Sequence, residues 1–136
     1  MIQHKNVNDL SEKEINFIKN SLTQSKQVTS VAYVKLRIID FYFIKKENNI
    51  IAFSCNKTSL IKNFDIEVGY SWVNPKYRGN IYGIKLFNFQ LKNIRNNKIK
   101  AYSINQINNN VMVKYCEKNN FKVFRSTDKL QWRYIK

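Results

Sequence analysis

The residues with the clearest chemical signature lie between Val73 and Gly83. A strand-like run of aromatic and β-branched residues ends there at Asn74-Pro75, a turn dipeptide. Arg78-Gly79-Asn80 follows and leads into a segment whose apolar residues recur every three or four positions, as on one face of a helix. A strand, a glycine-bearing turn and a helix start direct backbone N–H groups and the positive end of the helix dipole at one point. This arrangement favours a bound phosphate group, and Arg78 adds a positive charge beside it.

This stretch resembles the acyl-CoA-binding core of the GNAT family of N-acetyltransferases. The family pattern is a strand ending in Val-x-Pro, followed by Arg/Gln-x-x-Gly-x-Gly/Ala at the start of a helix. Val73-Asn74-Pro75 matches the first part, and the second part is matched by Arg78, Gly79, Asn80, Ile81, Tyr82 and Gly83. The departure is Ile81, which replaces the middle glycine and therefore needs a backbone in the α region.

A second stretch supports the same resemblance. In one branch of the family it reads roughly Thr-x-Asn, three residues, Asn-x-x-Met, and then a helix ending in Glu-Lys-Leu-Gly-Phe. The matching positions, in register without a gap, are Asn105, Asn109, Met112, Glu117, Lys118 and Phe121. Asn120 replaces the glycine before Phe121, and Asn tolerates the left-handed conformation found at helix ends.

The resemblance implies an N-acetyltransferase that uses acetyl-CoA as acyl donor. In the family, the pantetheine arm inserts between two strands that separate after the equivalent of Val73. The implied cofactor-binding residues are Trp72, Val73, Arg78, Gly79, Asn80, Ile81, Tyr82, Gly83, Asn105 and Asn109. Of these, Trp72 and Val73 would act through their backbone, and the two asparagines would bind the pantetheine amides. The alternatives are core packing for Trp72 and Val73 and a surface salt bridge for Arg78.

Acyl transfer to an amine needs a polarised thioester carbonyl, a neutral amine and, in some cases, a proton for the leaving thiolate. The family often has a carboxylate at the position of Glu67 that acts as general base through water; the alternative is a structural Glu paired with a Lys. The family's general-acid tyrosine corresponds by spacing to Cys116, and Tyr115 is adjacent. Neighbouring helix positions differ by about 100°, so only one of them faces the thiol. The sequence leaves open Cys116, Tyr115 or no acid.

Composition indicates a single domain covering residues 1–136, with 43% hydrophobic residues. No apolar run reaches the roughly 20 residues of a membrane span, and the N-terminus lacks the apolar core of a signal peptide. We therefore expect a cytoplasmic protein that does not contact a membrane. Two cysteines and one histidine do not support a disulfide framework or a structural zinc site, and we expect no metal.

The net charge of +15 is unevenly distributed. Residues 1–68 contain 10 Lys/Arg and 7 Asp/Glu, whereas residues 69–136 contain 14 and 2. Part of this excess can serve an anionic cofactor, and the remainder favours an anionic partner such as nucleic acid or an acidic protein. The alternative explanation is an AT-rich genome, which readily encodes Lys, Asn and Ile. The sequence does not identify the acceptor amine, and it does not distinguish a monomer from a homodimer.

A second functional hypothesis follows from the charge. A catalytically weak or inactive module of the same fold would bind nucleic acid or an acidic protein through its basic C-terminal half. Phosphate contacts would supply most of the affinity, helped by exposed rings among Tyr70, Tyr77, Tyr82 and Trp132. Binding of acetyl-CoA distinguishes the two hypotheses.

Local signals place these residues on a mixed α/β sheet flanked by helices. Ser11 and Glu14 form a capping box that begins a helix ending near residue 22. We expect an antiparallel meander of strands at 31–44, 50–56 and 64–73. Ile38-Ile39 breaks the alternation of the first of these strands, which indicates a bulge or burial on both faces.

The remaining elements follow the phosphate loop. Helices are expected at 81–96 and 109–118, and strands at 99–105, 121–125 and 130–135. Strand 99–105 should run parallel to the strand ending at Val73, because a helix joins them. The order fits the acyl-CoA N-acyltransferase fold with a shortened N-terminus, in which only residues 2–7 are available as a first strand.

Overall fold

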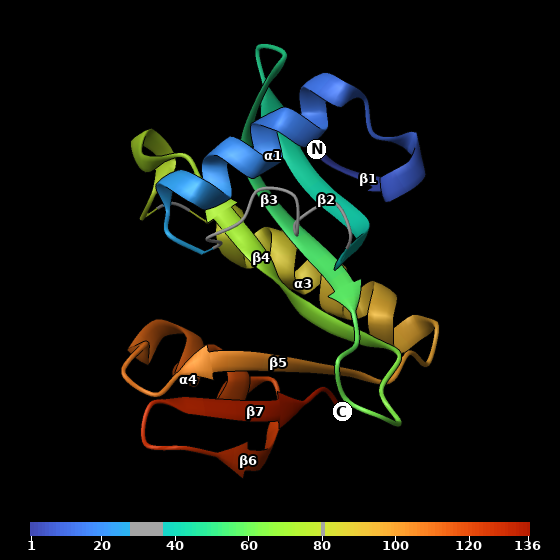
Figure 1. Ribbon diagram of the computed structural model, residues 1–136. Helices are drawn as coiled ribbons and strands as arrows, with labels where there is room; N and C mark the ends of the chain where they lie inside the picture. The colour runs from blue at the N-terminus through green and yellow to red at the C-terminus, as the bar shows by residue number, and fades with distance from the viewer. Residues whose placement is uncertain (28–36, 80) are drawn as a thin grey trace.

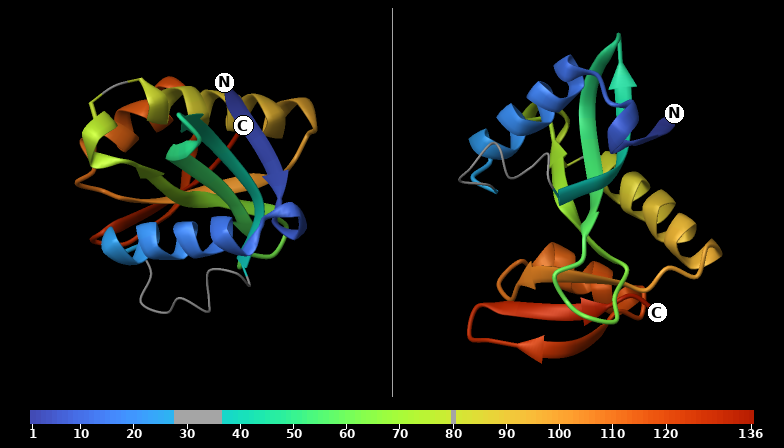
Figure 2. Two further views of the ribbon diagram at one scale, coloured as in Figure 1. Left: turned by 90° about the horizontal axis from the view of Figure 1, so that it is seen from above. Right: turned by 45° about the vertical axis from the view of Figure 1, so that its right-hand side comes forward.

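The computed structural model describes residues 1–27, 37–79 and 81–136. Its centre is a seven-stranded sheet of order β1-β2-β3-β4-β5-β7-β6. Helix α1 covers one face, and α3 and α4 cover the other (Figures 1 and 2). The bounds are β1 (Ile2–Asn6), α1 (Glu12–Gln24), β2 (Ile38–Lys46), β3 (Asn49–Thr58), β4 (Ile66–Val73), α3 (Tyr82–Asn96), β5 (Ala101–Gln106), α4 (Asn110–Lys118), β6 (Lys122–Ser126) and β7 (Leu130–Tyr134), with short 3-10 helices at Val7–Asp9 and Pro75–Tyr77.

The expected mixed sheet is confirmed. The meander β2-β3-β4 is antiparallel and β5 pairs with β4 in parallel. Both halves of the capping box form between Ser11 and Glu14. β1 is present and pairs with β2, so the first strand is retained. The first part of the long strand expected at 31–44 lies outside the described residues, and the register shift between Ile38 and Asp40 is the predicted bulge.

Apolar side chains fill both sides of the central strands. On the α1 side, Ile18 and Leu22 are buried against Phe41 and Phe53. On the α3 side, Ile94 is buried in the same cluster as Val68. Each such side chain contributes roughly 1.5–3 kcal/mol by its burial, so both helices are held firmly on the sheet that carries the site.

A bulge in β4 determines where the sheet opens. Val68 pairs with Asn56 and Ser71 with Ser54, so Gly69 and Tyr70 together face one residue of β3. Tyr70 has φ +56°, in the left-handed region that non-glycine residues seldom adopt. Because a bulge bends its strand, the pairing of β4 with β5 stops at Val68. The sequence-based expectation that the strands separate after Val73 was wrong, since the bend comes earlier in β4.

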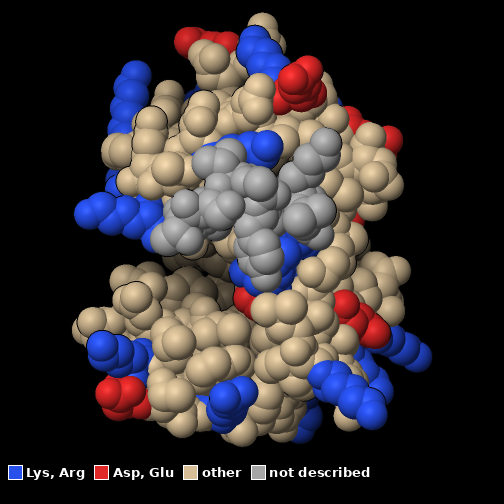
Figure 3. Space-filling view, viewed as in Figure 1, with Lys and Arg blue, Asp and Glu red and all other residues tan. Residues whose placement is uncertain are grey.

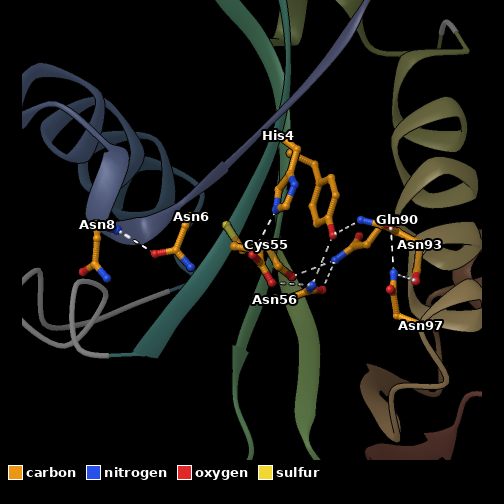
Figure 4. A network of polar contacts seen from close by, with 10 residues as sticks. His4, Asn6, Asn8, Cys55, Asn56, Gln90, Asn93 and Asn97 are labelled. Atoms are coloured by element: carbon orange, nitrogen blue, oxygen red, sulfur yellow. Dashed lines mark hydrogen bonds and ion pairs between the residues drawn. The ribbon is translucent and has the colours of Figure 1, made fainter.

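Gln90 of α3 anchors the helix at this bulge (Figure 4). Its Nε2 donates to the carbonyl oxygen of Cys55, the β3 residue opposite the bulge, at 3.0 Å, and to Asn56 Oδ1 at 2.7 Å. Its Oε1 accepts a hydrogen bond from Ser54 Oγ at 2.6 Å. Gln90 is only 1% exposed. A buried polar group must be paired, so these bonds fix α3 against the strand that opens the sheet.

Candidate functional site

A cleft occupies the wedge between β4 and β5. Its inner cavity of about 250 Å³ is lined by Gly69 and Ser71 of β4, by Ser103 and Asn105 of β5, and by Gln27 after α1. Figure 3 shows a hollow between the upper and lower halves of the molecule on the α1 side. The wedge exists because β4 bends away from β5 at the bulge, so backbone that would otherwise pair within the sheet lines a cavity.

A second cavity of about 750 Å³ continues from the first. It lies between the β4–α3 loop and α4, and its lining includes Arg78, Gly79 and Gly83. The two cavities share three lining residues, which are Phe87, Met112 and Tyr115. Together they form a path from the centre of the sheet to the N-terminus of α3.

The peptide groups at the end of β4 alternate in direction. The N–H of Asn74 donates to Ile51 O on the β3 side at 2.7 Å. Alternate residues of a strand direct their peptide groups to the same side, so Trp72 also faces β3, while Ser71 and Val73 face the cleft. Of the two residues predicted for backbone contact, only Val73 directs its peptide group to the cleft; Ser71, which was not predicted, does so as well.

The side chain of Trp72 packs within the protein. Its ring stacks on Phe53 at a centroid distance of 5.6 Å and meets Phe17 of α1 edge-on at 5.4 Å. The ring therefore ties α1 to the sheet beside the cleft. Its indole also lines a third cavity, of about 530 Å³, which shares Gln27 and Ser71 with the inner one.

The loop before α3 has the geometry of an anion-binding turn. Arg78 Nε donates to Val73 O at 2.9 Å, which folds the loop back on β4. Gly79 has φ +82°, a backbone conformation that residues with a side chain rarely adopt. No neighbouring atom lies within 4 Å of where a Cβ would be, so the backbone conformation, and not a lack of space, requires glycine here. Ile81 adopts the α region, as the sequence required, and gives α3 no side-chain cap. The first N–H groups of α3 are therefore available to an anion.

Tyr82 and Gly83 form the first turn of α3. A Cβ on Gly83 would lie 3.6 Å from Val73 Cγ2, in ordinary contact. Tyr82 is half-buried, with Lys46 Nζ 5.1 Å from its ring centre. Asn80 lies outside the described residues.

Asn105 and Asn109 both line the inner cavity but have protein partners as well. Asn105 Oδ1 accepts from Ser103 Oγ at 3.3 Å and lies 3.6 Å from Cys116 Sγ. Asn109 caps α4 by accepting from the N–H of Met112 at 3.3 Å. Within the described residues the side-chain carbonyl oxygens of both asparagines bond to the protein, and no hydrogen bond is formed by their side-chain N–H groups.

Tyr115 and Cys116 lie in different environments. Tyr115 lines both cavities, and its hydroxyl donates to Asn88 Oδ1 at 2.9 Å. Burial, reinforced by Cys116, raises the pKa of Tyr115 to about 12, so the hydroxyl keeps its proton at neutral pH. Cys116 is fully buried in a cluster with Leu91 and Phe121. Burial also raises the pKa of the Cys116 thiol, although the Arg133 charge opposes this.

Glu67 lies in a buried ion cluster on the α1 side of the sheet. Its Oε1 accepts from Arg37 Nη2 at 2.9 Å and from the Tyr102 hydroxyl at 3.0 Å, and its Oε2 lies 2.8 Å from Lys57 Nζ. Burial alone would raise the pKa of Glu67, but Lys57 and Arg37 outweigh it and the pKa is lowered. Burial lowers the pKa of Lys57 too. The carboxylate is thus ionised and a weak base.

Gly69 makes room for this cluster. A Cβ at this position would lie 3.2 Å from Lys57 Cε and 3.3 Å from Lys57 Nζ. The same ammonium group lies 4.0 Å from the centre of the Tyr70 ring. The bulge residues therefore line the cleft on one side and enclose a buried cation on the other.

The three tyrosines and the tryptophan considered for stacking on nucleic acid are all half-buried. Cations already lie over all four rings: Lys57 over Tyr70, Lys46 over both Tyr77 and Tyr82, and Arg125 over Trp132. In Figure 3, Lys and Arg lie both at the rim and near the centre of the visible face and are mixed with Asp and Glu.

No helix in residues 1–27, 37–79 and 81–136 combines the length and apolar character needed to cross a membrane. In the same ranges, no three His, Cys, Asp or Glu side chains gather as metal ligands would.

No family model and no curated protein matches the sequence. Solved structures do match. An acyl-CoA N-acyltransferase from Pseudomonas aeruginosa has a TM-score of 0.78 and 14% identity, over 100% of this chain and 99% of that chain. NAA60 from Arabidopsis thaliana in complex with acetyl-CoA has a TM-score of 0.74 and 10% identity over 98% of both chains.

A third structure, the N-acetyltransferase PseH of Campylobacter jejuni in complex with acetyl coenzyme A, has a TM-score of 0.62. It is 15% identical over 100% of this chain and 99% of that chain. The chain therefore has the acyl-CoA N-acyltransferase fold over its whole length, which confirms the fold that the two motifs predicted.

Proposed function

We propose that this protein is an N-acetyltransferase that uses acetyl-CoA as acyl donor. The observation that carries the proposal is the cleft opened by the β4 bulge, which presents the peptide groups of Ser71 and Val73 and continues to the uncapped N-terminus of α3. A ligand that has a long arm with amide groups and a pyrophosphate at its end requires both features, a cleft lined by peptide groups and a helix N-terminus that can bind an anion. The acetyl-CoA held by two structures of the same fold supports the same donor.

The proposed donor contacts follow the two cavities. Arg78, Gly79 and the first N–H groups of α3 hold the pyrophosphate, since they combine positive charge with free backbone donors. The peptide groups of Ser71 and Val73, with the side-chain N–H groups of Asn105 and Asn109, hold the amide arm. Acetyl-CoA supplies the acetyl thioester, and a backbone N–H of β4 polarises its carbonyl.

Of the two candidate acids, we propose Tyr115. Its side chain lines both cavities and its raised pKa keeps the hydroxyl protonated, so that it can give a proton to the leaving thiolate. Cys116 is fully buried in a cluster with Leu91 and Phe121, and we assign it a packing role. The hydroxyl must leave Asn88 in order to reach the thiol.

The general-base role of Glu67 stays a prediction, and the cluster offers another way to obtain a neutral amine. Arg37 and Lys57 carry two positive charges against one on Glu67, beside the cleft wall formed by Gly69 and Tyr70. A positive excess disfavours a second cation and lowers the pKa of an amine held near it. We propose that this field keeps the acceptor amine neutral, and that it favours acceptors that carry an anionic group.

The proposal is tested by measuring release of the CoA thiol from acetyl-CoA in the presence of primary amines. The panel pairs amines of equal size with and without a carboxylate or phosphate group. We expect turnover with the anionic members and little with cationic polyamines. Donor binding without turnover on any amine would instead favour the catalytically inactive module, with nucleic acid or an acidic protein as partner.

A further inference from the structure

We infer that Gln27 controls access of the acyl donor to the cleft by competing with the donor's amide groups for the carbonyl oxygen of Ser71. The inference rests on the proposed function, because it concerns the same cleft. It starts from one contact between residues distant in the sequence: Gln27 Nε2 donates to Ser71 O at 2.7 Å.

The Ser71 carbonyl is one of two on β4 that face the cleft. The other, Val73 O, accepts from Arg78 Nε at 2.9 Å. An extended amide chain that pairs with a strand needs both the carbonyl oxygens and the N–H groups along that edge. Gln27 therefore occupies the hydrogen-bonding position that an amide N–H of the donor requires, and it also lines the inner cavity.

The position of Gln27 is fixed by the end of α1. The N–H of Gln27 donates to Leu22 O at 2.9 Å and the N–H of Lys26 to Thr23 O at 3.1 Å, with Lys26 at φ +59°. These two bonds and a left-handed residue after the helix constitute a Schellman motif. Gln27 is therefore held beside β4 by a helix that packs on the core, and displacement requires movement of the side chain rather than of the backbone.

A second contact holds the side chain in place. Gln27 Nε2 also donates to Ser25 Oγ at 2.9 Å. The carboxamide thus stays anchored near the helix end while it contacts β4. A ligand with amide groups can replace its bond to Ser71, whereas a nucleotide bound only at the α3 loop has no group that reaches it.

The test compares Gln27→Ala with the wild type by calorimetry. The ligands are acetyl-CoA and adenosine 3′,5′-bisphosphate, a nucleotide without the amide arm. We expect Gln27→Ala to bind acetyl-CoA about two- to tenfold more tightly, the effect of releasing one competing hydrogen bond, and the nucleotide unchanged. Gln24→Ala removes an exposed glutamine from the last turn of α1 and serves as the matched control, with wild-type affinity for both ligands.

Equal or weaker binding of acetyl-CoA by Gln27→Ala would overturn the inference and leave the proposed function intact. A parallel change for both ligands would also overturn it, since it would indicate a general structural effect. If neither the wild type nor the variant binds acetyl-CoA, the proposed function fails and the inference with it. If Gln27→Ala binds acetyl-CoA tightly and the wild type does not, the result would support both the inference and the proposed function.

Discussion

Lys57 Nζ lies 2.8 Å from Glu67 Oε2 in the interior of the protein, where both side chains are less than 10% exposed. The strand pairing brings them together, since Lys57 of β3 is opposite Glu67 of β4. Arg37 supplies a second cation to the same carboxylate. Glu67 is therefore the anion that makes two buried positive charges tolerable beside the cleft.

Glu67→Gln should destabilise the fold strongly. The substitution leaves Arg37 and Lys57 buried without a countercharge, and loss of one partner of a buried pair typically costs about 3–5 kcal/mol in the free energy of unfolding. Urea denaturation at neutral pH measures the effect. The double variant Glu67→Gln/Lys57→Met removes the excess cation with little change in volume and should recover part of the loss. Unchanged stability in Glu67→Gln would contradict the structural role.

The stability of the wild type should fall in acid. The folded pKa of Glu67 is below its ordinary value of 4.5, so the unfolded chain takes up a proton first as the pH decreases. The stabilisation is complete above the ordinary value and is lost as the pH falls through the folded pKa. Denaturation midpoints measured from pH 7 downward should show a smaller acid-induced loss for Glu67→Gln than for the wild type. Parallel curves for the two proteins would mean that Glu67 is not responsible.

Tyr115→Phe should reduce kcat by about 100-fold if the hydroxyl protonates the leaving thiolate, at the lower end of the usual range for general acids. Cys116→Ala should leave kcat nearly unchanged and lower the stability instead. Steady-state assays with an acceptor identified from the amine panel compare them. Because the pKa of Tyr115 is raised to about 12, kcat of the wild type should show no loss on the alkaline side below that value. The opposite ranking of the variants would assign the acid to Cys116.

The order of elements and the loop before α3 could be predicted from sequence because their signals are local. Ser11 with Glu14, Asn74-Pro75 and the 3.6-residue periodicity after Gly83 each lie within a few residues of the feature they specify. Asn120, which replaces the glycine before Phe121, is a further local signal, because it adopts the left-handed conformation with φ +63°. These signals were enough to predict the fold of the whole chain.

The cleft itself could not be predicted in the same way, because it depends on register between strands. Gly69 inside a strand pattern is a local sign of a bulge, but it does not specify which residues of the neighbouring strand pair on either side, and the left-handed φ belongs to Tyr70 rather than to the glycine. The bulge changes which peptide groups face the cleft, so the peptide group of Ser71 faces it and that of Trp72 faces β3. Gln27 and Lys57 were missed because their partners on β4 lie far along the chain.

The most direct test of the account is calorimetric binding of acetyl-CoA to the wild type and to Arg78→Glu. Lys13→Glu, the same charge change at an exposed position in the first turn of α1, is the control for the effect of net charge. We predict micromolar binding by the wild type and the control, and its loss in Arg78→Glu. Absence of binding to the wild type at millimolar acetyl-CoA, or equal binding by Arg78→Glu and the control, would contradict a donor site at the start of α3.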